Sequence, residues 1–444
     1  MHFTSDQVLG LAPDAASAAN GKKLASTKHW RNLGQNAEAL WGECQGSALY
    51  QVRVDLSNTS VKCSCPSHKF PCKHGIGLML LAVDEKNVPL GEPPEWVASW
   101  LAKRAASQEQ KQEKAKEKAQ QPTTEAQIAA QAKRMEKHAA LVARGLDTLD
   151  LWLSDLMRNG IASVEQQPAS YWGQQAAQLV DAQAYNIAPR VRRLAEIPGS
   201  SARWPERLLG QVGKVALLTH AYRQRETLAP ALQADVRQLV DERLKKEEVT
   251  AHGDLVADDW LLLGQIVEEE DKLRAQWTWC IGPRSRRHAL ILQFAFRQDP
   301  FAEMLVPGTH QEATLAFFPG ANPLRAQIEA RVGEVAPIVG RLPGCDSIDA
   351  FLGTVAGMLA RQPWQDRFLC VLCDVTIVPN AAGGRWRVRD GNGVALPLAD
   401  GDYWRLLAVS GGHATDFAGE WDGERLRVLG ICADDMYYPL AGVE

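Results

Sequence analysis

The sequence lacks an apolar run long enough to cross a membrane. The apolar stretch Gly75–Val83 is far shorter than the roughly 20 residues that a spanning helix requires, and no other stretch comes closer. The first residues, MHFTSDQVLGLAPDAASAANGKK, also lack the basic start and apolar segment of a secretory signal. We therefore expect a cytoplasmic protein that makes no contact with a membrane.

Positive charge is not in surplus either. The formal net charge is -4 at pH 7, so any nucleic acid would have to contact a local basic patch. Only residues 101–140 carry an excess of bases, with nine Lys/Arg against five Asp/Glu. Because acids and bases interleave there, the segment is more typical of a solvated spacer than of an arm that follows phosphates.

Catalytic and nucleotide-binding signatures are absent as well. Gly210–Val215 lacks the loop length and the Ser/Thr of a phosphate-binding loop, and Gly391–Gly393 lacks the third glycine of a dinucleotide turn. Neither His-Glu-x-x-His nor Gly-x-Ser-x-Gly occurs. We expect no active site, no small-molecule substrate and no enzymatic activity.

The order of patterns along the 444 residues predicts an α+β protein of several domains. Residues 1–98 have mixed β and turn character and contain a small ββα unit at about 50–85. Residues 99–138 have almost nothing apolar to bury, which indicates a charged linker that is either flexible or helical. Leucines at helical spacing predict a helical region at 139–250. Short β-like runs between Gly, Pro, Asn and Asp then indicate a β-rich α+β domain at 251–444.

Two alternating runs and one apolar helix make up the ββα unit. In Tyr50–Leu56, apolar and polar side chains alternate with the period of a half-buried strand. The next run, Val61–Cys65, alternates again and places its two cysteines on one face, so the two runs predict a hairpin. The apolar residues of Ile76–Val83 then indicate a short helix.

Four potential metal ligands lie within twelve residues of this unit. Cys63 and Cys65 are two positions apart, six residues intervene, and Cys72 and His74 are again two apart. Three thiolates and one imidazole are the donor set of a closed, tetrahedral zinc site. On a regular helix Cys72 and His74 would point about 200° apart, so we expect Cys72 just before the helix and His74 in its first turn. The spacing predicts one structural zinc ion.

Other histidines and cysteines offer alternatives. His68, in the loop between the two pairs, is the rival for the fourth ligand. Without metal, the same residues would be buried thiols and a surface histidine, which requires their spacing to arise by chance. Cys370 and Cys373 lie in a strongly apolar run without a further ligand, so core packing is favoured over metal or redox chemistry. The dispersed cysteines are expected to be reduced and buried: Cys44, Cys280, Cys345 and Cys432.

Lysines accompany the predicted metal ligands. Three thiolates around a dication leave about one net negative charge, which Lys62, Lys69 and Lys73 can offset. No acidic residue lies between Leu56 and Val83, so we expect a basic outer surface on which these lysines contact nucleic acid or another partner. A second basic group is more typical of a solvated hairpin turn: Arg284, Arg286, Arg287 and His288.

These residues resemble the SWIM-type zinc finger, whose motif is Cys-x-Cys, a variable gap and Cys-x-His on a strand-strand-helix unit. The resemblance covers approximately residues 30–85, including LWGECQGSALYQVRVDL, KCSCPSHKFPCKH and the following apolar helix. It implies one zinc ion and a role in binding nucleic acid or protein, since SWIM modules occur in transposases, remodelling-type ATPases and signalling proteins. The longer chain is similar to bacterial SWIM-finger proteins of poorly defined function.

Two hypotheses follow for the function. In the first, the finger binds nucleic acid, with DNA favoured, or a protein partner, and the zinc is not catalytic. In the alternative, the chain is a protein-interaction scaffold of a bacterial multiprotein complex, associated with an ATPase, without a nucleic-acid role. An enzyme ranks last, because only the chain length favours it.

Overall fold

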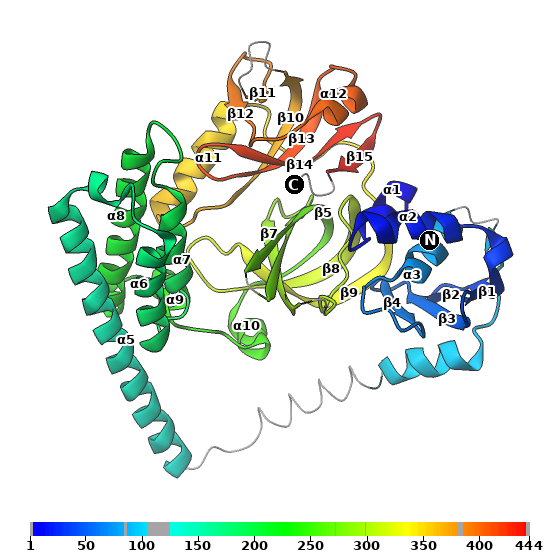
Figure 1. Ribbon diagram of the computed structural model, residues 1–444, viewed down its shortest axis with the longest axis horizontal. Helices are drawn as coiled ribbons and strands as arrows, with labels where there is room; N and C mark the ends of the chain where they lie inside the picture. The colour runs from blue at the N-terminus through cyan, green and yellow to red at the C-terminus, as the bar shows by residue number, and fades with distance from the viewer. Residues whose placement is uncertain are drawn as a thin grey trace.

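The computed structural model describes residues 3–83, 87–104, 106, 125–270, 272–297, 299–379 and 385–440. Figure 1 shows them as an N-terminal domain in blue, a helical bundle mainly in green, a central β-barrel, and a further sheet in orange and red beside the barrel. The predicted fold class, α+β with a helical middle and a β-rich C-terminal part, is confirmed. None of the described helices is both long and apolar enough to span a membrane.

The N-terminal domain is built on an antiparallel sheet in the order β1-β2-β3-β4. Apolar residues of β3 and β4, among them Val52, Val54 and Val61, alternate along the strands and pack on buried residues of the helix α3, such as Ile76 and Leu78. The predicted hairpin and helix are therefore present, but β4 ends at Cys63 instead of Cys65. The elements are α1 Ser5–Gly10, α2 Ala15–Leu24, β1 Trp30–Gln35, β2 Ala39–Gln45, β3 Leu49–Asp55, β4 Ser60–Cys63 and α3 Lys73–Val83.

The opposite face of this sheet is covered by the helical segment 95–104. The guanidinium of Arg53 on β3 lies over the rings of Trp96 and Trp100, 5.3 and 5.4 Å from their centroids. Arg104 donates a hydrogen bond of 2.6 Å to Ser60 of β4. The start of the predicted linker, 99–138, is thus a packed helix, whereas its residues 107–124 lie outside the described part.

The helical bundle begins within the predicted linker, because α5 starts at Glu125. Its core contains Leu146, Leu149, Leu153 and Leu156 of α5, which recur at helical spacing and are at most 4% exposed. Trp172 of α6 and Leu208 of α8 complete the centre of this core. The bundle helices are α5 Glu125–Asn159, α6 Ala169–Asp181, α7 Ala188–Arg193, α8 Trp204–Arg223 and α9 Pro230–Val240. The short helix α10 Lys246–His252 follows them and packs beside β8 of the barrel (Figure 1).

The barrel closes in the order β5-β6-β7-β9-β8, with β7 and β9 parallel and the other neighbours antiparallel. Numbered from β5, this is the topology of the OB-fold, a five-stranded Greek-key barrel. The long β5 makes closure possible, since its first half pairs with β8 and its second half with β6. The strands are β5 Leu255–Glu270, β6 Leu273–Ile281, β7 His288–Phe296, β8 Thr309–Phe317 and β9 Arg325–Pro337.

A six-stranded sheet in the order β12-β11-β10-β13-β14-β15 packs on the outer face of β5 and β6. Trp279 of β6 is fully buried there, and its indole N–H donates a 2.7 Å hydrogen bond to Glu420. The predicted domain 251–444 therefore contains two β structures that share an interface. The elements are α11 Ile348–Arg361, β10 Phe368–Val378, β11 Arg387–Arg389, β12 Ala395–Pro397, α12 Trp404–Ser410, β13 Thr415–Trp421, β14 Leu426–Ala433 and β15 Met436–Pro439.

The N-terminal domain contacts the barrel through specific hydrogen bonds. Gln7 donates to the carbonyl of Gly308 at 2.7 Å, and Thr59 donates to that of Met304 at 3.0 Å. Val306 joins the apolar core of the N-terminal domain. The domain is therefore held against the barrel by both polar and apolar contacts.

Candidate metal centre

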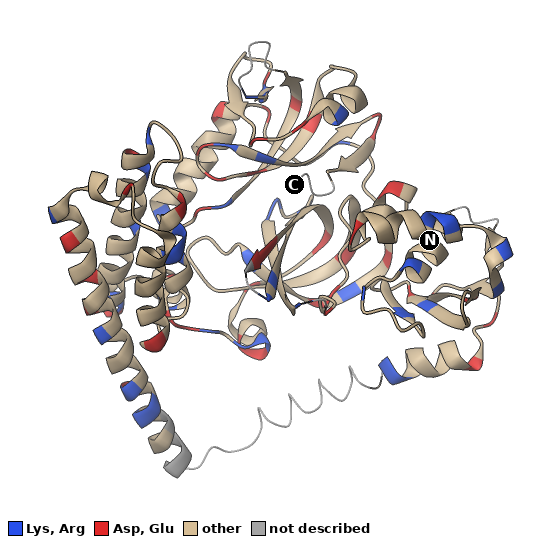
Figure 2. Cartoon of the chain, viewed as in Figure 1, with Lys and Arg blue, Asp and Glu red and all other residues tan. Residues whose placement is uncertain are grey.

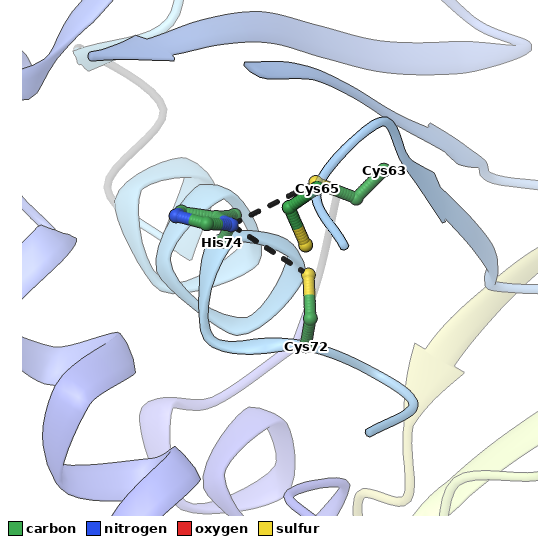
Figure 3. Close-up of side chains that lie close together, drawn as sticks. All are labelled: Cys63, Cys65, Cys72 and His74. Atoms are coloured by element: carbon green, nitrogen blue, oxygen red, sulfur yellow. Dashed lines mark hydrogen bonds between the residues drawn. The ribbon is translucent and has the colours of Figure 1, made fainter. Parts of the chain in front are cut away.

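Cys63, Cys65, Cys72 and His74 converge at one place in the N-terminal domain (Figure 3). Their potential ligand atoms all lie within 4.8 Å of one another. Cys72 and His74 are buried, and Cys63 and Cys65 are partly exposed. Among the described residues, no other group of three or more His, Cys, Asp or Glu side chains has this proximity.

Strand pairing positions the first two cysteines. Cys63 is the last residue of β4 and pairs with Val52, so its side chain points to the face that α3 covers. Beyond the strand, Ser64 still donates from its backbone N–H to the carbonyl of Gln51 at 3.0 Å. This bond keeps the chain beside β3 as far as Ser64 and brings Cys65 back to the cluster, although Cys65 is not in a strand.

The start of α3 positions the second pair. The N–H of Ile76 donates to the carbonyl of Cys72 at 3.1 Å, so Cys72 immediately precedes the helix. His74 lies in the first turn, which is where the spacing placed it. The ring of Tyr50 stands 4.9 Å from that of His74 and limits its rotation from the sheet side.

The distances suit a tetrahedral ion. With Zn–S near 2.3 Å and Zn–N near 2.0 Å, a tetrahedral site has ligand–ligand edges of roughly 3.5–3.8 Å. The Nδ1 of His74 is 3.7 Å from the sulfur of Cys63 and 3.9 Å from that of Cys72. All four ligand atoms lie within 4.8 Å of one another, so the residues present fit a zinc ion.

The thiols differ in their readiness to ionise. The hydrogen bond from the Cys63 thiol lowers the pKa of Cys72 to about 4, helped by His74 and the N–H of Gly75. The same bond, together with burial, raises the pKa of Cys63 far above its usual range, and burial raises that of Cys65. Because zinc binds thiolates, zinc binding must release protons from this cluster. The affinity for zinc must therefore decrease as the pH is lowered.

The rival ligands lie outside the cluster. His68 is exposed in the loop between the pairs. Cys44 of β2 is fully buried in the domain core, and burial raises its pKa to about 11. Cys370 and Cys373 are buried in β10, and burial raises the pKa of both thiols, as expected for core residues.

The structure does not bring the three predicted contact lysines to one surface. Lys62 pairs with Arg53 across the sheet, so its side chain points to the face opposite α3. Lys69 forms a 2.6 Å ion pair with Asp14 at the start of α2. Lys73 is exposed in the first turn of α3.

Sequence reasoning did not single out two exposed lysines of α2, Lys22 and Lys23. A Cβ on Gly21 would stand 2.5 Å from Cγ2 of Ile76 and 3.5 Å from the carbonyl oxygen of Lys73. Gly21 of α2 therefore lies against the start of α3, and the next two residues of α2, Lys22 and Lys23, are exposed. Figure 2 shows Lys and Arg in blue on the helices of this domain. The only signal in the sequence is Gly-Lys-Lys itself, which says nothing about a partner helix.

The second basic group, in the β6–β7 turn, is mostly neutralised. Arg284 forms ion pairs with Asp258 and Glu312, both at 3.2 Å. Arg287 pairs with Asp254 at 3.5 Å and lies over the ring of Phe317. These contacts agree with a structural turn more than with a phosphate-binding surface.

A Cys3His cluster on a strand-loop-helix unit is the donor set of a zinc finger. Family models identify the type: one described as a SWIM zinc finger matches residues 50–82, and one described as a SWIM-associated four-helix bundle domain matches residues 137–240. The second match ends where α9 ends and covers most of the helical bundle. The chain therefore contains one region similar to a SWIM zinc finger and one similar to the helical bundle that accompanies such fingers. No curated protein and no solved structure matched the chain.

Proposed function

We propose that the finger holds one structural zinc ion and that the lysines beside it bind the phosphate backbone of nucleic acid, with DNA favoured. Four protein ligands leave no open position for water or substrate, so the zinc orders the chain and performs no catalysis. A reducing cytoplasm keeps the thiols available to the metal.

The observation that supports this proposal is the group of uncompensated lysines at the α2–α3 contact. Lys22, Lys23 and Lys73 are exposed, and within the described part of the chain no carboxylate forms an ion pair with them. The metal ligands Cys72 and His74 flank Lys73. Zinc would therefore fix the place of Lys73 relative to α2, and phosphate oxygens are the natural partners of such a cluster.

Salt dependence tests the proposal. Three phosphate contacts predict a slope of about -2.7 for log K against log salt on duplex DNA, measured by fluorescence anisotropy with a labelled oligonucleotide. K22A/K23A/K73A should remove most of this slope. The matched control K103A/K133A/K137A removes the same charge from exposed sites elsewhere and should keep it. Absent or salt-independent binding, or equal losses in both variants, would contradict the proposal.

The barrel is not assigned to nucleic acid, despite its topology. OB-folds bind oligonucleotides on the face of their second and third strands, here β6 and β7. In this chain the middle of that face is covered by the six-stranded sheet, which packs on Trp279 and Leu290. The centre of the usual surface is therefore covered, and similarity of fold alone does not establish a function.

A protein-binding scaffold is the second candidate, favoured by what remains exposed on that face. Leu273, Phe294 and Phe296 are 46%, 53% and 52% exposed, and the strand register places them on one side of β6 and β7. Co-purification of a protein from the native cell that survives nuclease and is lost in F294S/F296S would favour the scaffold. Retention of the same protein by that variant would reject this surface.

A further inference from the structure

A cavity of about 370 Å³ lies where the β6–β7 turn meets α11 and β10. This volume is in the range of ~300–1,000 Å³ that is common for small-molecule sites. Its walls are mostly apolar: Phe351, Val355 and Met358 of α11, and Phe368, Leu369 and Val371 of β10.

Arg286 lines this cavity, and in the described part of the chain its guanidinium has no ion-pair partner. Arg286 is held by a hydrogen bond of 2.9 Å from its backbone N–H to the carbonyl of Gly282. The neighbouring Arg284 and Arg287 form ion pairs with carboxylates. Among the described residues, no carboxylate lies within ion-pair distance of Arg286. The nearby Asp346 is exposed and forms no ion pair with it. A guanidinium at an apolar cavity is suited to an anionic group.

A second polar group without a partner faces the same space. His288, the first residue of β7, lines the cavity, and no described residue forms a hydrogen bond with its ring. Burial lowers the pKa of His288 to about 4, so near pH 7 the ring is neutral and offers one donor and one acceptor.

We propose that this cavity binds a small organic monocarboxylate with an aliphatic or aromatic tail. The guanidinium of Arg286 binds the carboxylate, His288 donates a further hydrogen bond, and the α11 and β10 side chains enclose the tail. The ligand thereby supplies the negative charge that the protein does not provide to Arg286, and buries its apolar part at the same time. This site is separate from the zinc finger and does not depend on nucleic-acid binding.

Three eight-carbon probes with different head groups test the proposal: octanoate, octanol and octylammonium. Each is titrated against the full chain at pH 7, with isothermal calorimetry as the readout. Octanoate should bind at least about tenfold more tightly than octanol, since a hydrogen bond to a charged group contributes on that order, and octylammonium should bind weakest. In R286Q the preference for octanoate over octanol should disappear.

Two further variants separate this site from general binding. T354F places a ring at the cavity from an exposed position of α11 and should weaken octanoate and octanol alike. R158A removes an exposed arginine of the bundle and should change nothing. Equal binding of octanoate and octanol to the unmodified protein, unchanged octanoate affinity in R286Q, or no binding of any probe would overturn the proposal.

Discussion

Gly21 of α2 and Ile76 of α3 pack so closely that a Cβ on Gly21 would stand 2.5 Å from Cγ2 and 2.9 Å from Cβ of Ile76. Ile76 is fully buried two residues after His74, at the centre of the N-terminal core. The contact therefore links the helix that carries His74 to α2, the helix that carries Lys22 and Lys23.

Replacing Gly21 with alanine should push α2 away from α3. Although alanine favours helix by about 1 kcal/mol, the clash with a β-branched core residue should produce a net destabilisation of roughly 1–3 kcal/mol. Urea unfolding measures it. The matched control is G173A in α6, where an added Cβ would meet nothing within 4 Å and should be neutral or slightly stabilising. If both variants behave alike, the close contact is not important for stability.

Trp279 joins the barrel to the six-stranded sheet. In W279F the buried carboxylate of Glu420 loses its 2.7 Å donor, although Arg367 remains at 3.5 Å, and a small cavity forms. We expect a destabilisation of about 2–4 kcal/mol, followed by far-UV circular dichroism during urea unfolding. Trp404 is 61% exposed, so W404F should change stability by less than about 1 kcal/mol. A W279F protein as stable as W404F would show that the interface does not depend on this bond.

Asp235 predicts a pH-dependent effect on stability. Burial raises its pKa from 3.8 to about 6, and no cation lies within ion-pair distance in the described part of the chain. The carboxyl of Asp235 therefore holds its proton more tightly in the folded state than in the unfolded chain. The protonated carboxyl stabilises the folded state fully below about pH 4, and this stabilisation is lost as the pH rises to about 6.

D235N removes this titration, and its amide oxygen can still accept the 2.9 Å hydrogen bond from the N–H of Ala321. The free energy of unfolding of D235N minus that of the unmodified protein should rise by about 2–3 kcal/mol between pH 4 and pH 6.5. A difference that stays constant or falls over this range would contradict the assigned burial of the charge.

The parts of the fold that could be predicted from the sequence are those that depend on local patterns. The alternation around Val52 and Val61, and the cysteine spacing, depend on neighbouring residues only, so the hairpin, α3 and the meeting of the four side chains could be expected. The strand β1 was less evident, because its register shifts between Arg31 and Gly34 and interrupts the alternation.

Contacts between distant segments could not be predicted. The parallel pairing of β7 with β9 closes the barrel. The sequence does not show this pairing, because β-like runs have the same pattern whether they belong to the barrel or to the neighbouring sheet. The partners of the lysines are also non-local, because Lys69 is paired with Asp14, the residue that precedes α2.

The metal content of the purified chain tests the central claim most directly. After removal of loosely bound metal, mass spectrometry of the unmodified protein should give one zinc per chain, and C72S should give essentially none, because the remaining three ligands cannot close the tetrahedron. C44A, which alters a buried cysteine of the same domain outside the cluster, should keep its zinc. Unmodified protein without zinc, or C72S with a full complement, would contradict the account.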